Sequence, residues 1–311
     1  MTTRQAFILA FTVSNFCSRT QAQTTYTVAS FADAFLATGS PTNPEGTNLT
    51  GLNFGGAGAL FIAPPTSTNG EFQTVMQFDL SGATNLFNAA YGTNGWVVSG
   101  LSLQLTGNNG KAGEIPLNTI FPTISGGQFI IEWLSNNSWL EGTGTPITPA
   151  TNGVTYDSLP TLLSGAHDIL CTNTYSPPGD NVAVTYALPL DTNIVNEVMQ
   201  SGDVSFLLYA ADDQISYLFN SYNYGRGNQP LIHVTANATP PTITSEIYTN
   251  GSFQLTGLGA AMQQYQIQAS TNLGTTNWQS LGVAMADGTG MIQFTDTNTA
   301  SQSRRFYRLS R

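Results

Sequence analysis

Two carboxylates, each close to a tryptophan, are the residues whose types and spacing best suit catalysis. Glu132 directly precedes Trp133, and Glu141 lies two residues after Trp139 in the run Ser138–Thr145 (SWLEGTGT). Two carboxyl groups about 5 to 10 Å apart hydrolyse a glycosidic bond, one of them as acid and the other as base or nucleophile. The alternative is that Glu141 accepts hydrogen bonds from the amides of the Gly/Thr turn that follows it. We favour this second interpretation.

The two histidines do not complete a known catalytic motif. His167 stands beside Asp168 in a polar segment that we expect to be a loop, and His233 falls in an alternating, strand-like segment. The sequence contains no Gly-x-Ser-x-Gly nucleophile elbow, no His-Glu-x-x-His zinc motif and no phosphate-binding loop. These observations do not favour an enzyme with a Ser/His or metal-bound-water mechanism.

The segment 220–228 (NSYNYGRGN) has the residue types that bind sugars. Glycan recognition combines stacking on aromatic rings with hydrogen bonds to hydroxyl groups. The predicted ligand contacts in this segment are Tyr222, Asn223, Tyr224 and Arg226. Trp139 is a further candidate. The alternatives are a solvated hairpin with its tyrosines at a sheet edge, and a packing role for Trp139.

Acidic residues also raise the possibility of a structural Ca²⁺ ion, which prefers hard oxygen ligands. Asp33, Asp212 and Asp213 are the candidate metal ligands. Their spacing does not match an EF-hand or a calcium-binding repeat, so a solvated acidic turn is the alternative.

The scaffold that must position these residues is predicted to be all-β. Hydrophobic residues make up 41% of the 311 residues and charged residues 8%, and the apolar residues recur in short alternating runs between Gly-, Asn- and Thr-rich turns. Strands are expected at Tyr26–Leu36, Ala59–Ala63, Glu71–Leu80, Trp96–Thr106, Gln128–Leu134, Val182–Leu188, Val204–Tyr209, Ile215–Phe219 and Leu231–Val234. The clearest expected helix is Asp191–Gly202, with Asp191 or Thr192 as its cap and Gly202 at its end. Residues 40–58 are expected to form an irregular surface loop.

The first 23 residues have the pattern of a secretory signal peptide. Arg4 precedes the apolar run Ala6–Val13, and cleavage is expected near Ala22. That run is too short to span a bilayer and no later apolar run is long enough, so we expect an exported protein without a membrane span. Cys171 is then the only cysteine left, which excludes an internal disulfide. It is expected to be a small buried apolar residue, with a reactive thiol as the alternative.

A short proline-containing linker, residues 238–241, divides the mature chain into two expected domains. Residues 24–237 are expected to form a jelly-roll-like β-sandwich. Residues 242–311 have the size and strand spacing of a seven-stranded immunoglobulin or fibronectin type III sandwich, and the missing disulfide favours the fibronectin-like form.

Charge is unevenly divided between these domains. Residues 24–239 contain fifteen acidic residues against Lys111 and Arg226, whereas residues 240–311 have three acidic residues and four arginines. An acidic main domain argues against binding to nucleic acid or anionic lipid, which requires a basic surface. The segment Arg304–Arg311 is either a solvated cationic end or a contact for an acidic surface.

Several segments of the first domain carry a resemblance to a known family. They are Ala32–Phe35, Gly58–Leu60, Phe72–Leu80, Trp139–Gly144, Val204–Leu208, Phe219–Ser221 and Gln229–Val234. Together they resemble the DNRLRE-type, disaggregatase-related carbohydrate-binding β-sandwich modules of secreted bacterial and archaeal proteins. In place of the charged Arg/Glu segment that names the family, this chain has Ser221–Arg226 (SYNYGR). The resemblance therefore implies carbohydrate binding without the charged-glycan specificity of relatives.

The end of the chain carries a second resemblance. The segments Tyr265–Leu273, Asn277–Trp278, Phe294–Asp296 and Arg305–Leu309 resemble the C-terminal fibronectin-like modules of Verrucomicrobia-type secreted proteins.

Together these observations favour an exported, non-catalytic carbohydrate-binding protein of the cell surface or extracellular matrix, with a polysaccharide or cell-surface glycan as its partner. A structural or adhesion protein with protein partners is the alternative. A polysaccharide-degrading enzyme is the third possibility, and it requires two facing carboxylates in a deep cleft.

Overall fold

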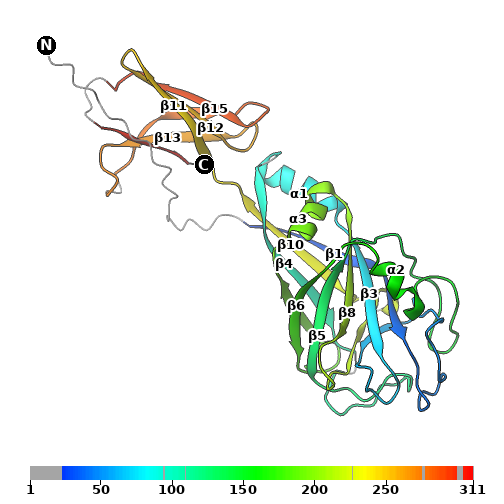
Figure 1. The fold of residues 1–311 in the computed structure, drawn as a ribbon. Coiled ribbons are helices and arrows are strands. Elements are labelled where there is room, and N and C mark those ends of the chain that lie inside the picture. Colours follow the sequence, from blue (N-terminus) through cyan, green and yellow to red (C-terminus); the bar gives the residue numbers. More distant parts are fainter. Residues whose placement is uncertain are drawn as a thin grey trace. The chain divides into compact units, whose positions relative to one another are not determined.

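The computed structural model describes residues 23–93, 95–108, 110–225, 227–274, 277–299 and 304–310. The expected signal peptide, apart from its last residue, and the candidate Arg226 lie outside these residues. The chain divides into two compact units. Among the described residues, the larger combines 25–84 with 98–235, and the smaller combines 23–24, 85–97 and 236–310. Both are built from antiparallel strands, so the all-β prediction is confirmed (Figure 1).

The larger unit is organised around one eight-stranded sheet, with strand order β6-β5-β8-β3-β1-β10-β4-β7. A two-stranded ribbon, β2-β9, accompanies it. The strands are β1 (Thr24–Ala37), β2 (Ala59–Ile62), β3 (Phe72–Asp79), β4 (Trp96–Thr106), β5 (Gly127–Leu134), β6 (His167–Tyr175), β7 (Ala183–Leu188), β8 (Asp203–Ala210), β9 (Tyr217–Asn220) and β10 (Leu231–Ala238).

The two edge strands of this sheet approach each other. The Sγ atom of Cys171 in β6 lies 3.9 Å from the carbonyl oxygen of Ala187 in β7. The sheet therefore curls into a barrel-like sandwich, and its concave face encloses the core. Cys171 lies partly exposed on an edge strand, so the expectation of a buried cysteine is wrong.

Aromatic side chains fill the concave face. The ring of Phe35 stacks on Phe54 with centroids 4.5 Å apart and meets Phe121 edge-on at 5.2 Å, and Phe61 stacks on Phe121 at 4.9 Å. Burying one such side chain contributes roughly 1.5–3 kcal/mol. Phe54 belongs to residues 40–58, which were expected to form a surface loop. That prediction is wrong for Leu49, Asn53, Phe54 and Ala57, which are buried.

The convex face of the sheet carries a second, smaller core. Apolar residues of β1, β3, β5 and β8 pack there against the segment 139–163, which contains the 3₁₀ turn η1 (Tyr156–Ser158) and the one-turn helix α2 (Leu159–Leu162). Trp139 and Tyr156 of this segment pack against that core. Residues 139–163 are therefore a cover over the sheet, and we call them the cover segment.

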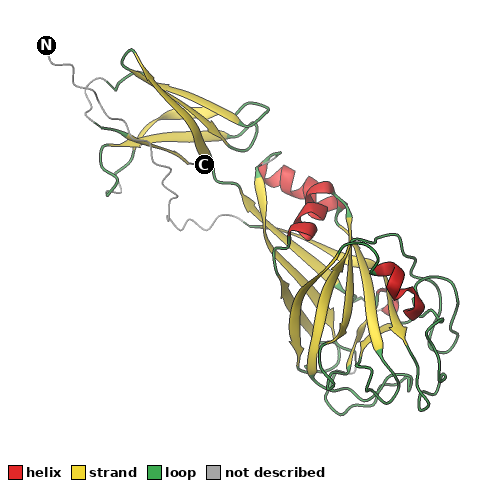
Figure 2. Cartoon of the chain, viewed as in Figure 1, coloured by secondary structure: helices red, strands yellow, loops and turns green. Residues whose placement is uncertain are grey.

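The two longer helices are α1 (Ser81–Tyr91) and α3 (Thr192–Gln200). Figure 2 shows long loops at the end of the sheet opposite α3. The carboxylate of Asp191 caps α3 by accepting from the backbone of Asn193 at 2.8 Å, as predicted. The left-handed residue at the end of α3 is Ser201, with φ 57°, and not Gly202 as expected. Among the residues described, no helix has the length and apolarity that crossing a membrane requires.

The smaller unit contains two three-stranded sheets, β11-β12-β15 and β14-β13-β16. Phe253 and Leu255 of one sheet pack against Ala269 and Tyr307 of the other. The strands are β11 (Thr242–Thr249), β12 (Ser252–Leu258), β13 (Gln264–Ser270), β14 (Gln279–Met285), β15 (Met291–Asp296) and β16 (Phe306–Ser310). The described part of this sandwich thus has six strands, whereas seven were expected.

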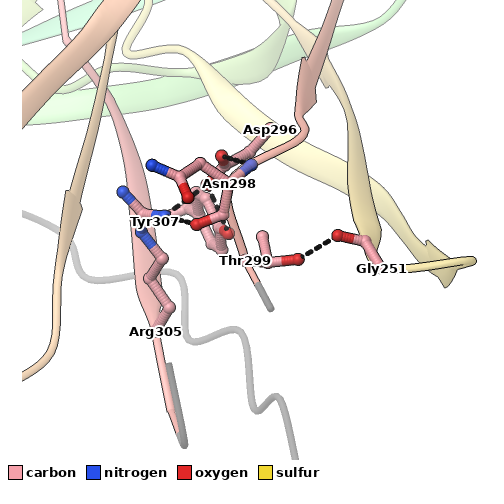
Figure 3. Close-up of polar contacts among 6 residues, drawn as sticks. All are labelled: Gly251, Asp296, Asn298, Thr299, Arg305 and Tyr307. Atoms are coloured by element: carbon pink, nitrogen blue, oxygen red, sulfur yellow. Dashed lines mark hydrogen bonds and ion pairs between the residues drawn. The ribbon is translucent and has the colours of Figure 1, made fainter. Parts of the chain in front are cut away.

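A buried polar network joins the two sheets of this sandwich (Figure 3). Arg305 Nη1 lies 2.8 Å from Asp296 Oδ2, and the Tyr307 hydroxyl donates to the same oxygen at 3.0 Å. Arg305 also donates to the carbonyl of Asn298 at 3.0 Å. The guanidinium of Arg308 lies 4.4 Å from the ring centroid of Trp278. These contacts give Arg305 and Arg308 partners within their own unit, so the solvated cationic end expected for this segment is wrong at both residues.

Replacing Tyr307 with phenylalanine is expected to destabilise the smaller unit by about 1.5–3 kcal/mol, the usual contribution of a hydrogen bond to a charged group. The reason is that Asp296 Oδ2 then keeps Arg305 but loses the other of its two partners, the Tyr307 hydroxyl. Hydrogen exchange of the β12 and β13 amides measures the effect. Tyr248→Phe, at an exposed tyrosine of β11, is the control and should leave exchange unchanged. Equal exchange in both variants would contradict the role given to Tyr307.

Candidate functional site: a tyrosine turn and the buried network behind it

The side chain of Asn53 is the centre of a buried hydrogen-bond network in the larger unit. Its amide nitrogen donates to the carbonyl oxygens of Glu141 and Val154, both at 2.7 Å. Its amide oxygen accepts from the backbone N–H groups of Gly55 at 3.1 Å and Gly144 at 3.0 Å. Asn53 is fully buried, and every hydrogen-bonding position of its side chain is used. This one residue therefore joins the 53–56 loop to both ends of the 141–154 segment.

The Gly/Thr run after Trp139 needs its glycines because the backbone of residues 141–144 packs directly against the backbone of the 53–56 loop. A Cβ atom at Gly144 would lie 1.8 Å from the carbonyl oxygen of Asn53, and one at Gly55 would lie 2.0 Å from that of Glu141. Gly142 has φ +84°, in the left-handed region that favours glycine. The run is thus a packing motif, and the turn amide of Gly144 bonds to Asn53.

The carboxylate of Glu141 forms its hydrogen bonds with residues outside the Gly/Thr run. Its Oε1 accepts from the backbone N–H of Asp33 at 3.2 Å and from Asn223 Nδ2 at 3.0 Å. Strand β10 no longer flanks β1 beside Asp33. The N–H of Ser30, three residues earlier in β1, bonds to the carbonyl of Pro230, which directly precedes the first residue of β10. Glu141 thereby supplies the hydrogen-bond acceptor for the backbone N–H of Asp33, a position in β1 that β10 leaves unpaired. The expectation that Glu141 bonds to amides of the Gly/Thr turn is wrong.

Asp33 reaches this network because of a β-bulge in β1. The register between β1 and β3 shifts between Ser30 and Ala32. Residues three apart in a regular strand face opposite sides of the sheet, and the extra residue brings them to one side. The Ser30 hydroxyl accordingly donates to Asp33 Oδ2 at 2.9 Å. The shift begins at Ser30, which pairs with Phe78 of β3.

The electrostatics of the two carboxyl groups differ from those of exposed ones. The pKa of Asp33 is raised to about 7: burial raises it most, hydrogen bonds from Tyr222 and Ser30 lower it, and the charge of Glu141 raises it. Burial also raises the pKa of Glu141, while the hydrogen bonds from Asp33 and Asn223 lower it. The two carboxyl groups thus share one poorly solvated region.

The tyrosine turn lies directly over these carboxyl groups. Residues Tyr222–Tyr224 form the 3₁₀ turn η2, which Ser221 caps and Gly225 ends in the left-handed region with φ 74°. The backbone N–H of Tyr222 donates to Asp33 Oδ2 at 2.8 Å. Asn223 donates to the carbonyl of Gly55 at 2.9 Å as well as to Glu141. The turn is therefore held from behind by β1, the 53–56 loop and the cover segment.

The predicted ligand contacts differ in their accessibility. Tyr222 is 46% exposed, and Asn223 is exposed although its amide nitrogen is used within the network. Tyr224 is half-buried. Trp139 is also half-buried, since its ring packs in the cover segment and its indole N–H donates to Ser205 Oγ at 3.1 Å. The structure thus places Tyr222, Asn223 and Tyr224 together, and it places Trp139 in a packing role.

The three predicted metal ligands do not come together. Asp33 lies in the network described above. Asp212 accepts from the backbone of Gln128 at 2.7 Å and closes the turn between β8 and β9, and Asp213 accepts from Thr66 Oγ1 at 3.0 Å. In the part of the chain that the structure describes, no group of three or more His, Cys, Asp or Glu residues has a metal-binding arrangement.

A second polar cluster contains the other carboxylate of the sequence pair. Glu132 Oε1 lies 2.5 Å from Nδ1 of His167, which begins strand β6 and is not in a loop as expected. Burial first, and then the charge of Glu132 and a hydrogen bond to it, raise the pKa of Tyr209 to about 12. A tyrosine with so high a pKa stays protonated at neutral pH, so Tyr209 is a poor base there. His233 lies in β10, as expected, beside Thr27 Oγ1 at 2.8 Å.

Asn53, Ser30 and Gly55 are the functional residues that the sequence did not reveal. Asn53 lies in a segment that contains glycine, asparagine and threonine throughout, so nothing distinguishes it from its neighbours. The buried aromatic Phe54, which is followed by the glycines Gly55 and Gly56, is the one local signal of close packing in that loop.

Comparisons with known proteins add neither a family nor a function to this description. No family model matches the chain, and no curated protein matches it. Among solved structures, native alpha-2-macroglobulin from Escherichia coli, spanning domains NIE-MG1, is similar at 15% identity over 57% of this chain and 76% of that chain. Its TM-score is 0.14, too low to carry an argument. The strand arrangement by itself shows an all-β protein with large antiparallel sheets in a barrel-like sandwich.

Proposed function

We propose that this chain is an exported, non-catalytic carbohydrate-binding protein of the cell surface or extracellular matrix, of the kind found in DNRLRE-type modules. The observation that supports this most is the exposed turn Tyr222–Tyr224, which a buried network holds in place. A surface that is fixed before binding loses little conformational entropy when a ligand arrives. A rigid aromatic surface is also what stacking on a sugar ring requires.

The chemistry available at the turn fits a neutral or weakly polar glycan. The ring of Tyr222 offers an apolar face, and among the described residues its hydroxyl and that of Tyr224 have no hydrogen-bond partner. Asn223 Oδ1 adds an acceptor for a sugar hydroxyl, while its donors stay inside the network. Aromatic faces with a few polar groups at fixed positions are the usual components of small-molecule recognition.

Incubating the mature chain with an array of polysaccharides tests the proposal. We expect retention on at least one glycan, with binding that persists at high salt because stacking depends little on ionic strength. Absence of binding to every polysaccharide, together with self-association of the protein, would contradict the proposal. That outcome would favour the alternative of a structural or adhesion protein.

A further inference from the structure

We propose that Asp33 and Glu141 bind a divalent cation, Ca²⁺, behind the tyrosine turn. The observation that suggests it is an oxygen atom without a partner. Asp33 is fully buried and its Oδ2 accepts from Ser30 and Tyr222, but its Oδ1 has no hydrogen-bond partner among the described residues. Buried carboxylate oxygens of this kind are paired or bound to a metal in folded proteins.

A second carboxylate stands next to the first. Glu141 Oε1 accepts from the backbone N–H of Asp33 at 3.2 Å, so the two carboxyl groups are neighbours. Its other oxygen, Oε2, makes no hydrogen bond to any part of the chain that the structure describes. Asp33 is fully buried and Glu141 is half-buried. Two adjacent carboxylates repel each other in such surroundings, and a cation between them converts that repulsion into attraction.

No side-chain cation supplies this charge within the described residues. The ion pairs there are His167 with Glu132 and Arg305 with Asp296, and neither involves Asp33 or Glu141. Lys111, the lysine of the larger unit, lies beside Gly179. The larger unit is also strongly acidic, with fifteen acidic residues in 24–239. A bound metal ion would balance the two carboxylates in their ionised form.

The ligand chemistry selects Ca²⁺ among common cations. The oxygens that the two carboxyl groups leave free are Oδ1 of Asp33 and Oε2 of Glu141, so both ligand atoms are oxygens. Ca²⁺ accepts six to eight oxygen ligands with flexible geometry, whereas Zn²⁺ and Cu²⁺ prefer nitrogen or sulfur. An affinity in the range of about 10⁻⁴–10⁻³ M is typical of extracellular calcium modules. This site does not depend on the glycan-binding proposal.

Thermal unfolding and titration calorimetry of the full chain with CaCl₂ after chelation test the proposal. We expect one Ca²⁺ per chain. With Ca²⁺ at roughly ten times its dissociation constant, we expect the midpoint for unfolding of the larger unit to rise by about 3–6 °C. Asp33→Asn keeps an acceptor for the Tyr222 N–H and removes the charge, so it should lower the affinity at least about tenfold. Glu141→Gln should do the same and serves as an independent variant if Asp33→Asn folds poorly.

Asp213→Asn is the matched control, because this exposed carboxylate belonged to the predicted ligands and lies outside the site. It should bind Ca²⁺ as the wild type does. Absence of heat and of any midpoint shift in the wild type would overturn the proposal. Wild-type affinity in both Asp33→Asn and Glu141→Gln would overturn it as well. Neither readout involves a glycan, so a failure here leaves the carbohydrate proposal unaffected.

Discussion

Replacing Asn53 with alanine is expected to lower the free energy of unfolding of the larger unit by roughly 4 kcal/mol or more. Four backbone groups lose their partner at once: the carbonyls of Glu141 and Val154 and the N–H groups of Gly55 and Gly144. Each buried group left without a partner costs about 1–3 kcal/mol. Few single substitutions reach such a value, because few side chains satisfy four buried groups.

Urea unfolding followed by hydrogen exchange of the β3 and β8 amides measures this loss. Asn152→Ala is the matched control, since Asn152 is an exposed asparagine that bonds to Thr143 of the same segment. It should cost no more than about 1 kcal/mol. Equal destabilisation by the two variants would show that Asn53 is not the centre of the network.

The second large effect is a dependence of stability on pH that comes from Asp33. Its pKa rises from 3.8 to about 7 because the carboxyl group is buried. Between these two values the folded chain holds a proton that the unfolded chain has released. The free energy of unfolding therefore falls as pH rises from about 4 to 7, and it levels off above the folded pKa. At 1.36 kcal/mol per pKa unit, the total fall is roughly 4 kcal/mol.

Comparing the wild type with Asp33→Asn isolates this contribution, since other carboxyl groups titrate in both. In the presence of a chelator, the difference in stability between the two proteins should change by several kcal/mol between pH 4 and pH 8, with the variant gaining relative to the wild type at high pH. Parallel pH profiles would contradict the burial of an unpaired Asp33 carboxyl group. Ca²⁺ should reduce the fall in the wild type, because the ion stabilises the ionised carboxylate.

Regular, locally encoded elements were predictable from the sequence. Leu101, Leu103 and Leu105 alternate with polar residues, and β4 has the predicted bounds. The cap of α3 was identified because Asp191 acts on amides only two and three residues away. In both elements the determining contacts are close in the sequence, so the pattern of residues specifies the structure.

Strand β6 shows where that signal weakens. Its residues His167–Tyr175 are mostly exposed or half-exposed because it is an edge strand, and Ile169 faces solvent at 61% exposure. Polar residues therefore occupy positions at which a central strand would carry apolar ones. The sequence consequently suggested a polar loop there.

The site itself was predictable as separate pieces but not as an assembly. Tyr222, Asn223 and Tyr224 stand together in the sequence, and Asp33 and Glu141 were each singled out. The bonds that join them span 108 residues from Asp33 to Glu141 and 82 from Glu141 to Asn223. Contacts across such separations depend on strand order and on the bulge in β1, and neither leaves a local pattern.

The most direct test of carbohydrate binding by the tyrosine turn is titration calorimetry of three proteins with the best-retained polysaccharide. They are the wild type, the double variant Tyr222→Ala/Tyr224→Ala, and the control Tyr248→Ala, which removes a tyrosine that is 45% exposed, against 46% for Tyr222. Losing stacking on the tyrosines at about 1 kcal/mol or more each should weaken binding at least roughly tenfold in the double variant, and the control should bind as the wild type does. Undiminished binding by a folded double variant would contradict the account.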